Sequence, residues 1–234
     1  MKIRKRIHRT GGIVSEKGFK KLLKTYLDIE LTLKAQKKFS LYLKELSSWN
    51  KRINLISRKK DKPEDIYRHF LDSLLVFKAA QVPQSLKILD LGSGAGFPGI
   101  PMKIIREDLN IVMVESMRKK VLFLKKMIEL LGLKEIAVLQ ERVEDLQSLP
   151  EFKEGFDFVT AKAFGKLKET VLISYPFLKE GGVLVAFKGS SYRREILELL
   201  EIPQKLEIQI QDIKFFEIAE IGLRRFLVFI EKTT

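Results

Sequence analysis

The sequence predicts an α/β protein in which a mostly parallel, doubly wound sheet follows an N-terminal helical extension and ends in a β-hairpin. Two observations predict this fold class. Between residues 86 and 200, strand-like apolar runs alternate with helical patterns, which is typical of parallel strands joined by crossover helices. The first of these runs passes directly into a glycine-rich segment at 92–99, where such sheets carry ligand-binding loops.

The N-terminal segment, residues 1–24, carries nine basic side chains and a single acid, Glu16. It also contains the pair Gly11-Gly12 and has few apolar residues. We therefore expect a flexible basic arm that orders on binding an anion. A solvated tail without a partner is the alternative.

Two helical patterns come next and define a predicted helical cap over residues 25–80. Apolar residues recur near helical spacing from about 31 to 48. Proline is favoured at the first helical position, so Pro63 opens a second helix. The apolar stripe of that helix consists of Ile66, Phe70, Leu74 and Phe77.

The remaining segment, 81–234, has the pattern of a wound sheet. Strands are expected near 86–91, 110–115, 135–139, 156–161 and 182–188. Helices are expected near 98–106, 117–131, 167–178 and 191–200. Two final strand-like runs, 206–216 and 223–231, have no helix between them and should pair as a hairpin at one end of the sheet. A five-strand wound sheet closed by a hairpin is the usual architecture of class I methyltransferases.

The glycine-rich loop favours a particular nucleotide cofactor. Alternating glycines leave backbone N–H groups open to a ligand. The dinucleotide fingerprint requires a glycine where this chain has Phe97, and the carboxylate of Asp90 would hold an ammonium group but repel a phosphate. These features favour S-adenosylmethionine over NAD. The loop residues expected to contact it are Asp90, Gly92, Ser93, Gly94, Gly96 and Phe97.

Other candidates follow the ends of the later strands, where open α/β sheets bind their ligands. Glu115 ends the second strand and is expected to accept hydrogen bonds from the ribose hydroxyls. Val143 and Glu144 follow the third strand and are placed to meet the adenine edge. A capped helix start with exposed acids is an equally good interpretation of that segment.

Two lysines end the fourth and fifth strands, Lys162 and Lys188. Basic residues at strand ends often only face water. Two of them above a methyl-donor site favour contact with nucleic-acid phosphates or base edges. On the second cap helix, His69 and Asp72 lie three residues apart on one face. A histidine satisfied by hydrogen bonding is the simpler interpretation of that pair.

Composition excludes several chemistries. Without cysteine, the chain has no disulfide, thiolate zinc site or cysteine nucleophile, and its two histidines disfavour a metal site. The 44 Lys and Arg residues against 30 Asp and Glu give a net charge of +14, which attracts polyanions, with nucleic acid as the leading partner. No apolar run approaches the roughly 18 residues of a membrane span, and the N-terminus lacks the apolar centre of a signal peptide. We therefore expect a cytoplasmic protein without a membrane partner.

Several separate segments resemble the bacterial small-subunit ribosomal RNA guanine-N7 methyltransferases, also called glucose-inhibited division protein B. The matching segments are Trp49-Asn50 with Asn54-Leu55, Arg68 to Ser73, Gly92 to Pro101, Lys119 to Val121 with Phe123-Leu124, Arg142 to Glu144, Val159 to Phe164, and Phe187 to Gly189. The most specific is Gly-Phe-Pro-Gly-Ile-Pro at 96–101. The resemblance covers roughly residues 31 to 230.

The resemblance implies S-adenosylmethionine as the donor and a guanine in the 530 loop of 16S ribosomal RNA, or of a small-subunit precursor, as the acceptor. It also implies a cofactor site lined by Gly92, Phe97, Val143, Glu144 and Lys162. The chain departs from the family at 161–163, where Ala-Lys-Ala replaces the usual Ser-Arg-Ala. A lysine keeps the charge but loses the planar fork of arginine.

Guanine N7 has a lone pair and no proton, so methylation there needs no general base, and positioning can supply the catalysis. The residues expected to act catalytically are Arg142, Lys162 and Lys188. The residues expected to contact RNA are Arg4, Arg6, His69, Arg142 and Lys188. Another rRNA or tRNA methyltransferase of this fold, or a non-catalytic RNA-binding protein, is the alternative. We expect a monomer.

Overall fold

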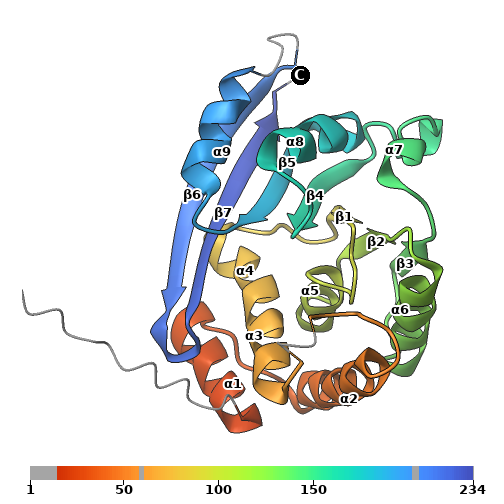
Figure 1. The fold of residues 1–234 in the computed structure, drawn as a ribbon, viewed down its shortest axis with the longest axis vertical. Coiled ribbons are helices and arrows are strands. Elements are labelled where there is room, and N and C mark those ends of the chain that lie inside the picture. The colour runs from red at the N-terminus through yellow and green to blue at the C-terminus, as the bar shows by residue number, and fades with distance from the viewer. Residues whose placement is uncertain (1–14, 58–60, 202–205, 234) are drawn as a thin grey trace, which may run out of the picture.

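The computed structural model describes residues 15–57, 61–201 and 206–233, and its strands form one seven-stranded sheet (Figure 1). The strand order is β3-β2-β1-β4-β5-β7-β6, with β1 to β5 parallel and the two last strands antiparallel. The strands are β1 Lys87–Leu91, β2 Asn110–Val114, β3 Ile136–Leu139, β4 Phe156–Lys162, β5 Leu178–Lys188, β6 Ile208–Ile218 and β7 Leu223–Lys232. The predicted wound sheet and C-terminal hairpin are confirmed.

The α-helices in the described part of the chain are α1 Glu16–Leu22, α2 Leu33–Asn50, α3 Pro63–Leu74, α4 Val76–Ala79, α5 Gly99–Ile105, α6 Arg118–Leu130, α7 Val143–Leu146, α8 Leu167–Ser174 and α9 Tyr192–Glu198. A π-helical turn, Leu23–Leu27, continues α1. Short 3₁₀ turns occupy Pro150–Phe152, Tyr175–Phe177, Leu199–Glu201 and Ala219–Ile221. The helix predicted over 167–178 ends earlier, because Pro176 lacks the N–H that an α-helix needs.

The sheet separates two hydrophobic cores. Alternate side chains of a strand point to opposite faces. On one face, Ile88 and Val185 pack in a core with α1, α2, α3, α5 and α6. On the other, Leu89, Val159 and Leu184 pack in a second core with α7, α8 and α9. Both faces are covered, as a parallel sheet requires.

The N-terminal helices differ from the expected organisation. The flexible arm was expected to extend to residue 24, but α1 begins at Glu16, capped by the hydroxyl of Ser15. The ring of Phe19 lies 5.0 Å from the ring of Tyr67 and 5.4 Å from that of Phe39. The arm boundary is therefore wrong from residue 16 onwards, because buried apolar residues at helical spacing outweigh the surrounding lysines. Residues 1–14, which include Arg4 and Arg6, lie outside the described part of the chain.

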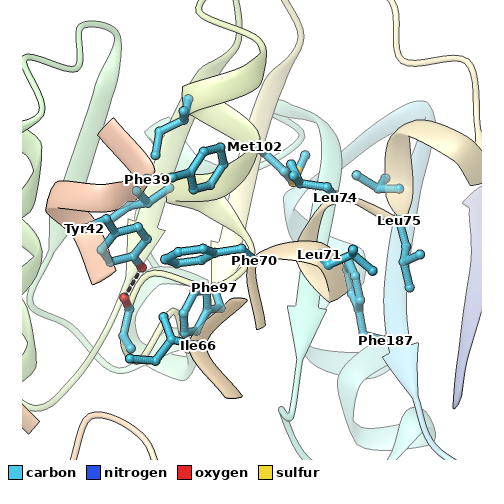
Figure 2. Close-up of a cluster of buried hydrophobic side chains, with 14 of the residues drawn as sticks. Phe39, Tyr42, Ile66, Phe70, Leu71, Leu74, Leu75, Phe97, Met102 and Phe187 are labelled. Carbon is cyan, nitrogen blue, oxygen red and sulfur yellow. Dashed lines mark hydrogen bonds between the residues drawn. The ribbon is translucent and has the colours of Figure 1, made fainter. Parts of the chain in front are cut away.

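The helical cap packs directly against the loop that follows β1 (Figure 2). The ring of Phe70 lies 5.0 Å from that of Tyr42 and 5.9 Å from that of Phe97. The hydroxyl of Tyr42 donates a hydrogen bond to the carbonyl oxygen of Ala95. The same core continues to Phe187 on β5. The cap thus fixes the position of the loop relative to the sheet.

Candidate active site at the carboxyl edge of the sheet

Most backbone N–H groups of the loop between β1 and α5 donate hydrogen bonds within the protein. The N–H groups that donate within the protein are those of Ser93 to Val114 O (3.0 Å), Gly94 to Glu115 Oε2 (3.0 Å), Gly96 to Ser93 O (2.7 Å) and Phe97 to Ser93 O (3.0 Å). The expectation that the alternating glycines leave these amides open to a ligand is therefore wrong for all four. The glycines serve the loop in another way.

The glycines permit left-handed backbone and close packing. Gly92 has a φ of +62°, and a Cβ there would lie 2.7 Å from Cδ2 of Phe164. Gly96 has a φ of +95°, and a Cβ there would lie 2.6 Å from Cδ1 of Ile100. Only glycine adopts such angles without strain and leaves this space. The ring of Phe164 can therefore lie directly over the start of the loop.

Asp90 is buried under the loop, with none of its surface exposed. Its Oδ1 accepts a hydrogen bond from the hydroxyl of Thr160 (2.9 Å), and its Oδ2 accepts one from the N–H of Gly99 (3.3 Å). Burial raises the pKa of Asp90 to about 6, although these hydrogen bonds oppose the shift. The predicted contact with the donor's ammonium group is not available in this arrangement, because the carboxylate supports the loop from inside.

Glu115 follows β2 and reaches the loop from the side. Its Oε2 accepts from Gly94 N–H and its Oε1 from Met117 N–H (2.8 Å), while Lys120 Nζ lies 3.7 Å away. A carboxylate offers about four acceptor directions. Two N–H donors therefore leave it able to accept hydrogen bonds from a ligand's hydroxyl groups.

These residues surround a cavity of about 270 Å³ at the ends of β1, β2 and β3. Its volume is close to the lower limit of about 300 Å³ for small-molecule sites. The lining residues are Gly92, Val114, Glu115, Ser116, Glu141, Arg142, Val143, Glu144 and Phe164. The structure thus brings together five predicted site residues: Gly92, Glu115, Arg142, Val143 and Glu144. Arg142 is exposed and immediately precedes α7.

Lys162, Phe97 and His69 form a second cluster, under the helical cap. Lys162 Nζ lies 3.4 Å from Asp72 Oδ2, 3.5 Å from His69 Nδ1 and 5.0 Å from the centre of the Phe97 ring. The imidazole of His69 stacks on Phe97, with 5.2 Å between the ring centres. The carboxylate of Asp72 also binds Arg225 through two hydrogen bonds of 2.7 and 2.8 Å.

The charges in this cluster are buried together. Burial lowers the pKa of Lys162, and Asp72 only partly restores it. Burial alone would raise the pKa of Asp72, but Lys162 and Arg225 hold it below its ordinary value. Asp72 is therefore ionised at neutral pH and links α3 to β4 and β7.

Lys188 is also engaged, at the end of β5. Its Nζ lies 2.9 Å from Glu195 Oε2 on α9 and donates to the carbonyl oxygen of Gly165 (2.9 Å). The residue is only 7% exposed. The expectation that Lys188 contacts nucleic acid is therefore wrong in this arrangement, since its ammonium group joins the segment after β4 to α9.

Sequence reasoning missed three functional neighbours: Phe164, Thr160 and Arg225. Phe164 and Thr160 belong to the segment 159–164 that carries the family resemblance, so a signal for them was present. Arg225 is 153 residues from Asp72, and no local pattern joins the two. Among the described residues, no group of three or more histidine and acidic side chains is arranged to hold a metal ion. No helix in that part of the chain is long and apolar enough to cross a bilayer.

Comparison with known proteins identifies close relatives. The family model for GidB, rRNA small subunit methyltransferase G, matches residues 35–224. The ribosomal RNA small subunit methyltransferase G of Desulfitobacterium hafniense (strain Y51) is 35% identical over 215 residues, covering 92% of this chain and 88% of that protein. The enzyme of the same name from Clostridium botulinum (strain Loch Maree / Type A3) is 34% identical over 206 residues, covering 88% of this chain and 86% of its own length.

Solved structures resemble the fold at much lower identity. M. jannaschii TYW2 in complex with AdoMet has a TM-score of 0.57 at 17% identity, covering 78% of this chain and 80% of that one. The ribosomal protein L11 methylase from Lactobacillus delbrueckii subsp. bulgaricus has a TM-score of 0.54 at 16% identity, covering 72% of this chain and 80% of its own. These two likenesses bear on the fold alone, which is that of the S-adenosylmethionine-dependent methyltransferases.

Proposed function

Because this chain belongs to the rRNA small subunit methyltransferase G family, we propose that it methylates N7 of a guanine in the 530 loop of 16S ribosomal RNA. Membership makes it an S-adenosylmethionine-dependent rRNA methyltransferase. The base and position come from the resemblance of the motifs. The observation that carries the assignment to a site is the cavity at the ends of β1 to β3, beside the buried Lys162 cluster.

The cavity fits a nucleoside better than a diphosphate. Three acids, Glu115, Glu141 and Glu144, line it against one cation, Arg142, and this excess of negative charge repels a diphosphate. The four loop amides that donate within the protein do not offer a phosphate cradle either. Glu115 retains acceptor capacity for the ribose hydroxyls, and Val143 supplies an apolar wall for adenine. When bound, S-adenosylmethionine supplies an electrophilic methyl group on a sulfonium.

The protein's own contribution is positioning, because guanine N7 needs no base to remove a proton. Arg142 is exposed at the cavity and is suited to a phosphate of the RNA. Lys162 is held between Asp72 and His69, close to the Phe97 ring, so its charge is fixed beside the cofactor loop. Holding the reacting groups in line can supply up to roughly 7–11 kcal/mol. Lys188 contributes indirectly, by fixing α9 and the segment after β4.

The oligomeric state and the cellular location are also part of the proposal. We propose that the protein acts as a monomer. A cytoplasmic location follows from the proposed RNA substrate, which bacteria keep in the cytoplasm.

The direct test maps the methylated base. Undermethylated 16S RNA and small subunits are incubated with labelled donor, and N7-methylguanine is located by borohydride and aniline cleavage. We expect cleavage at one guanine of the 530 loop. A methyl group at another base would support the second rRNA or tRNA enzyme, and donor binding without transfer would support a non-catalytic RNA-binding protein.

A matched pair of variants tests the cavity. Glu115→Gln is expected to weaken donor binding about tenfold, because a carboxylate hydrogen bond to a ligand is worth about 1.5–3 kcal/mol. Glu180 is an exposed acid near the amino end of β5, away from the cavity. The Glu180→Gln variant should therefore bind the donor as the wild type does. Calorimetric titration measures both, and equal affinities in the two variants would remove Glu115 from the site.

A further inference from the structure

Three aromatic side chains stack in a row across α9 and the C-terminal hairpin. The ring of Tyr192 lies 3.7 Å from that of Phe226, centre to centre, with 21° between the planes. The ring of Phe226 lies 4.7 Å from that of Phe215, with 28° between the planes. We call Tyr192, Phe226 and Phe215 the aromatic row. The function described above uses none of them.

The aromatic row lies where the hairpin extends past the active-site edge of the sheet. Lys188, the last residue of β5, pairs in register with Phe226 of β7. Beyond that pair, β6 and β7 continue alone, from Phe216 opposite Arg225 to Ile218 opposite Leu223. Figure 1 shows this end of the hairpin reaching toward α1. The hairpin therefore overhangs the edge at which β1, β4 and β5 end.

The row is open at its outer end. Ile213 and Val228, two pairs further inside the hairpin, pack in the core that also contains residues of α9. The next pair on that face is Phe215 and Phe226, and Phe215 is 46% exposed. The stack therefore begins at Tyr192, the first residue of α9, and ends with a half-exposed ring, that of Phe215.

Arginines flank the row at both ends. The guanidinium of Arg193 lies 5.9 Å from the Tyr192 ring centre, and that of Arg224 lies 5.7 Å from the Phe215 ring centre. The side chain of Arg224 is 69% exposed, and its Nε is 3.4 Å from Glu217. An exposed ring with cations beside it matches the chemistry of single-stranded RNA, whose bases stack on aromatics and whose phosphates bind arginine.

Short contacts connect the row to the cavity. Lys188, which pairs with Phe226, donates a hydrogen bond to the carbonyl oxygen of Gly165. Phe164, the residue before Gly165, lines the cavity and covers Gly92. Tyr192 comes only four residues after Lys188, and the Lys188–Glu195 pair fixes the helix that carries it. An RNA strand leaving the cavity along the β5 end would meet the row first.

We propose that the aromatic row, together with Arg193 and Arg224, binds an unpaired RNA segment that flanks the target guanine. A base stacks on the exposed ring of Phe215, next to the guanidinium of Arg224, and the arginines bind neighbouring phosphates. The placement beside the target guanine depends on the proposed function; the stacking of single-stranded RNA does not. RNA is favoured over a second copy of the chain because the net charge of +14 makes two copies repel.

The test uses the full-length protein and three substitutions. Phe215→Ala should weaken RNA binding about tenfold, within the range measured for removal of one stacking aromatic. Phe215→Tyr keeps the ring and should restore the affinity. Leu197→Ala is the matched control, because Leu197 is a 65% exposed apolar residue on α9 outside the row. Fluorescence anisotropy is measured with the 530-loop fragment carrying its single-stranded flanks and with a short oligoadenylate.

The outcomes separate the two proposals. If wild type leaves the 16S guanine unmethylated while Phe215→Ala still weakens oligoadenylate binding, the proposed function fails and the stacking surface stands. If Phe215→Ala binds both RNAs as tightly as Leu197→Ala does, the surface proposal is overturned. It is also overturned if sedimentation shows that wild type self-associates through Phe215 while RNA affinity stays unchanged. Calorimetry with S-adenosylmethionine should give equal donor affinity in all variants.

Discussion

At the residue scale, the cofactor loop is built from left-handed glycines and buried polar support. Gly92 makes room for Phe164, and Asp90 holds the loop from below through Thr160 and Gly99. These contacts stabilise the folded chain, and they also shape the cavity in which the donor is proposed to bind. Single substitutions can separate the two contributions.

Gly92→Ala should lower both stability and donor affinity. A residue with a Cβ at a φ of +62° costs roughly 1–2 kcal/mol, and the added atom displaces Phe164 from the cavity wall. We expect the affinity for S-adenosylmethionine to fall about tenfold, which corresponds to about 1.4 kcal/mol. Calorimetry and urea unfolding measure the two effects.

The matched control is Gly132→Ala, which has a φ of +54° but no atom within 4 Å of the added Cβ. It should lose similar stability and keep normal donor affinity. Equal donor affinities in the two alanine variants would show that Phe164 does not shape the donor site.

Asp90→Asn should alter how stability depends on pH. The folded pKa of about 6 lies above the ordinary value of 3.8, because burial disfavours the charged carboxylate. Between these two pH values the folded state binds more protons than the unfolded state, so the contribution of Asp90 to stability falls as pH rises. The cost is fully present above about pH 6 and amounts to about 3 kcal/mol.

The variant should therefore gain stability relative to wild type as pH rises from 4 to 7. Urea unfolding of both proteins at a series of pH values measures the difference, in which the titrations of other groups cancel. A stability difference that stays constant across this range would mean that Asp90 is not buried as a carboxylate.

At the element scale, Asp72 ties α3 to β4 and β7 through Lys162 and Arg225. Asp72→Asn should cost about 3–5 kcal/mol, since it leaves the buried Lys162 and the partly buried Arg225 without a counter-charge. Lys162→Met should cost less than about 1 kcal/mol, because Arg225 still pairs with Asp72 and burial already disfavours the charged lysine.

We expect Lys162→Met to lower activity although it hardly lowers stability. If Lys162 positions the substrate, Lys162→Met should lose at least about tenfold in kcat, or about 1.4 kcal/mol of barrier, while remaining folded. Methyl transfer at saturating donor and urea unfolding provide the two measurements. A fully active Lys162→Met would remove Lys162 from the catalytic residues and leave it a structural cation.

At the scale of the whole molecule, the parallel part of the sheet could be predicted because most of its strands contain an apolar run that is followed by turn residues. The role of Asp90 could not, because the sequence places it before the glycine-rich loop but does not show that its carboxylate accepts hydrogen bonds from Thr160 and Gly99. Helix α1 was also not predicted, because lysines dominate the composition of its segment and only a few apolar residues pack against the cap. Contacts such as Asp72 with Arg225 join distant elements and follow only from the folded arrangement.

The excess positive charge also acts at this scale, because binding RNA releases counterions from its phosphates. Each neutralised phosphate steepens the plot of log affinity against log salt by about 0.7 for single strands and 0.9 for duplex. If Arg4 and Arg6 contact RNA as the sequence predicts, replacing both by glutamine should make the slope shallower by about 1.4 to 1.8. Anisotropy titrations of the 530-loop fragment at several salt concentrations measure the slope.

The control must remove the same charge elsewhere. Lys126 lies in the last part of α6, and Lys134 lies just before β3. Both are therefore toward the amino ends of the strands, whereas the cavity is at their carboxyl ends. Replacing both by glutamine lowers the net charge equally but should leave the slope unchanged, because the slope counts contacted phosphates and not total charge. If both double variants shift the slope alike, the long-range field of the whole protein attracts the RNA and the N-terminal arginines make no specific contact.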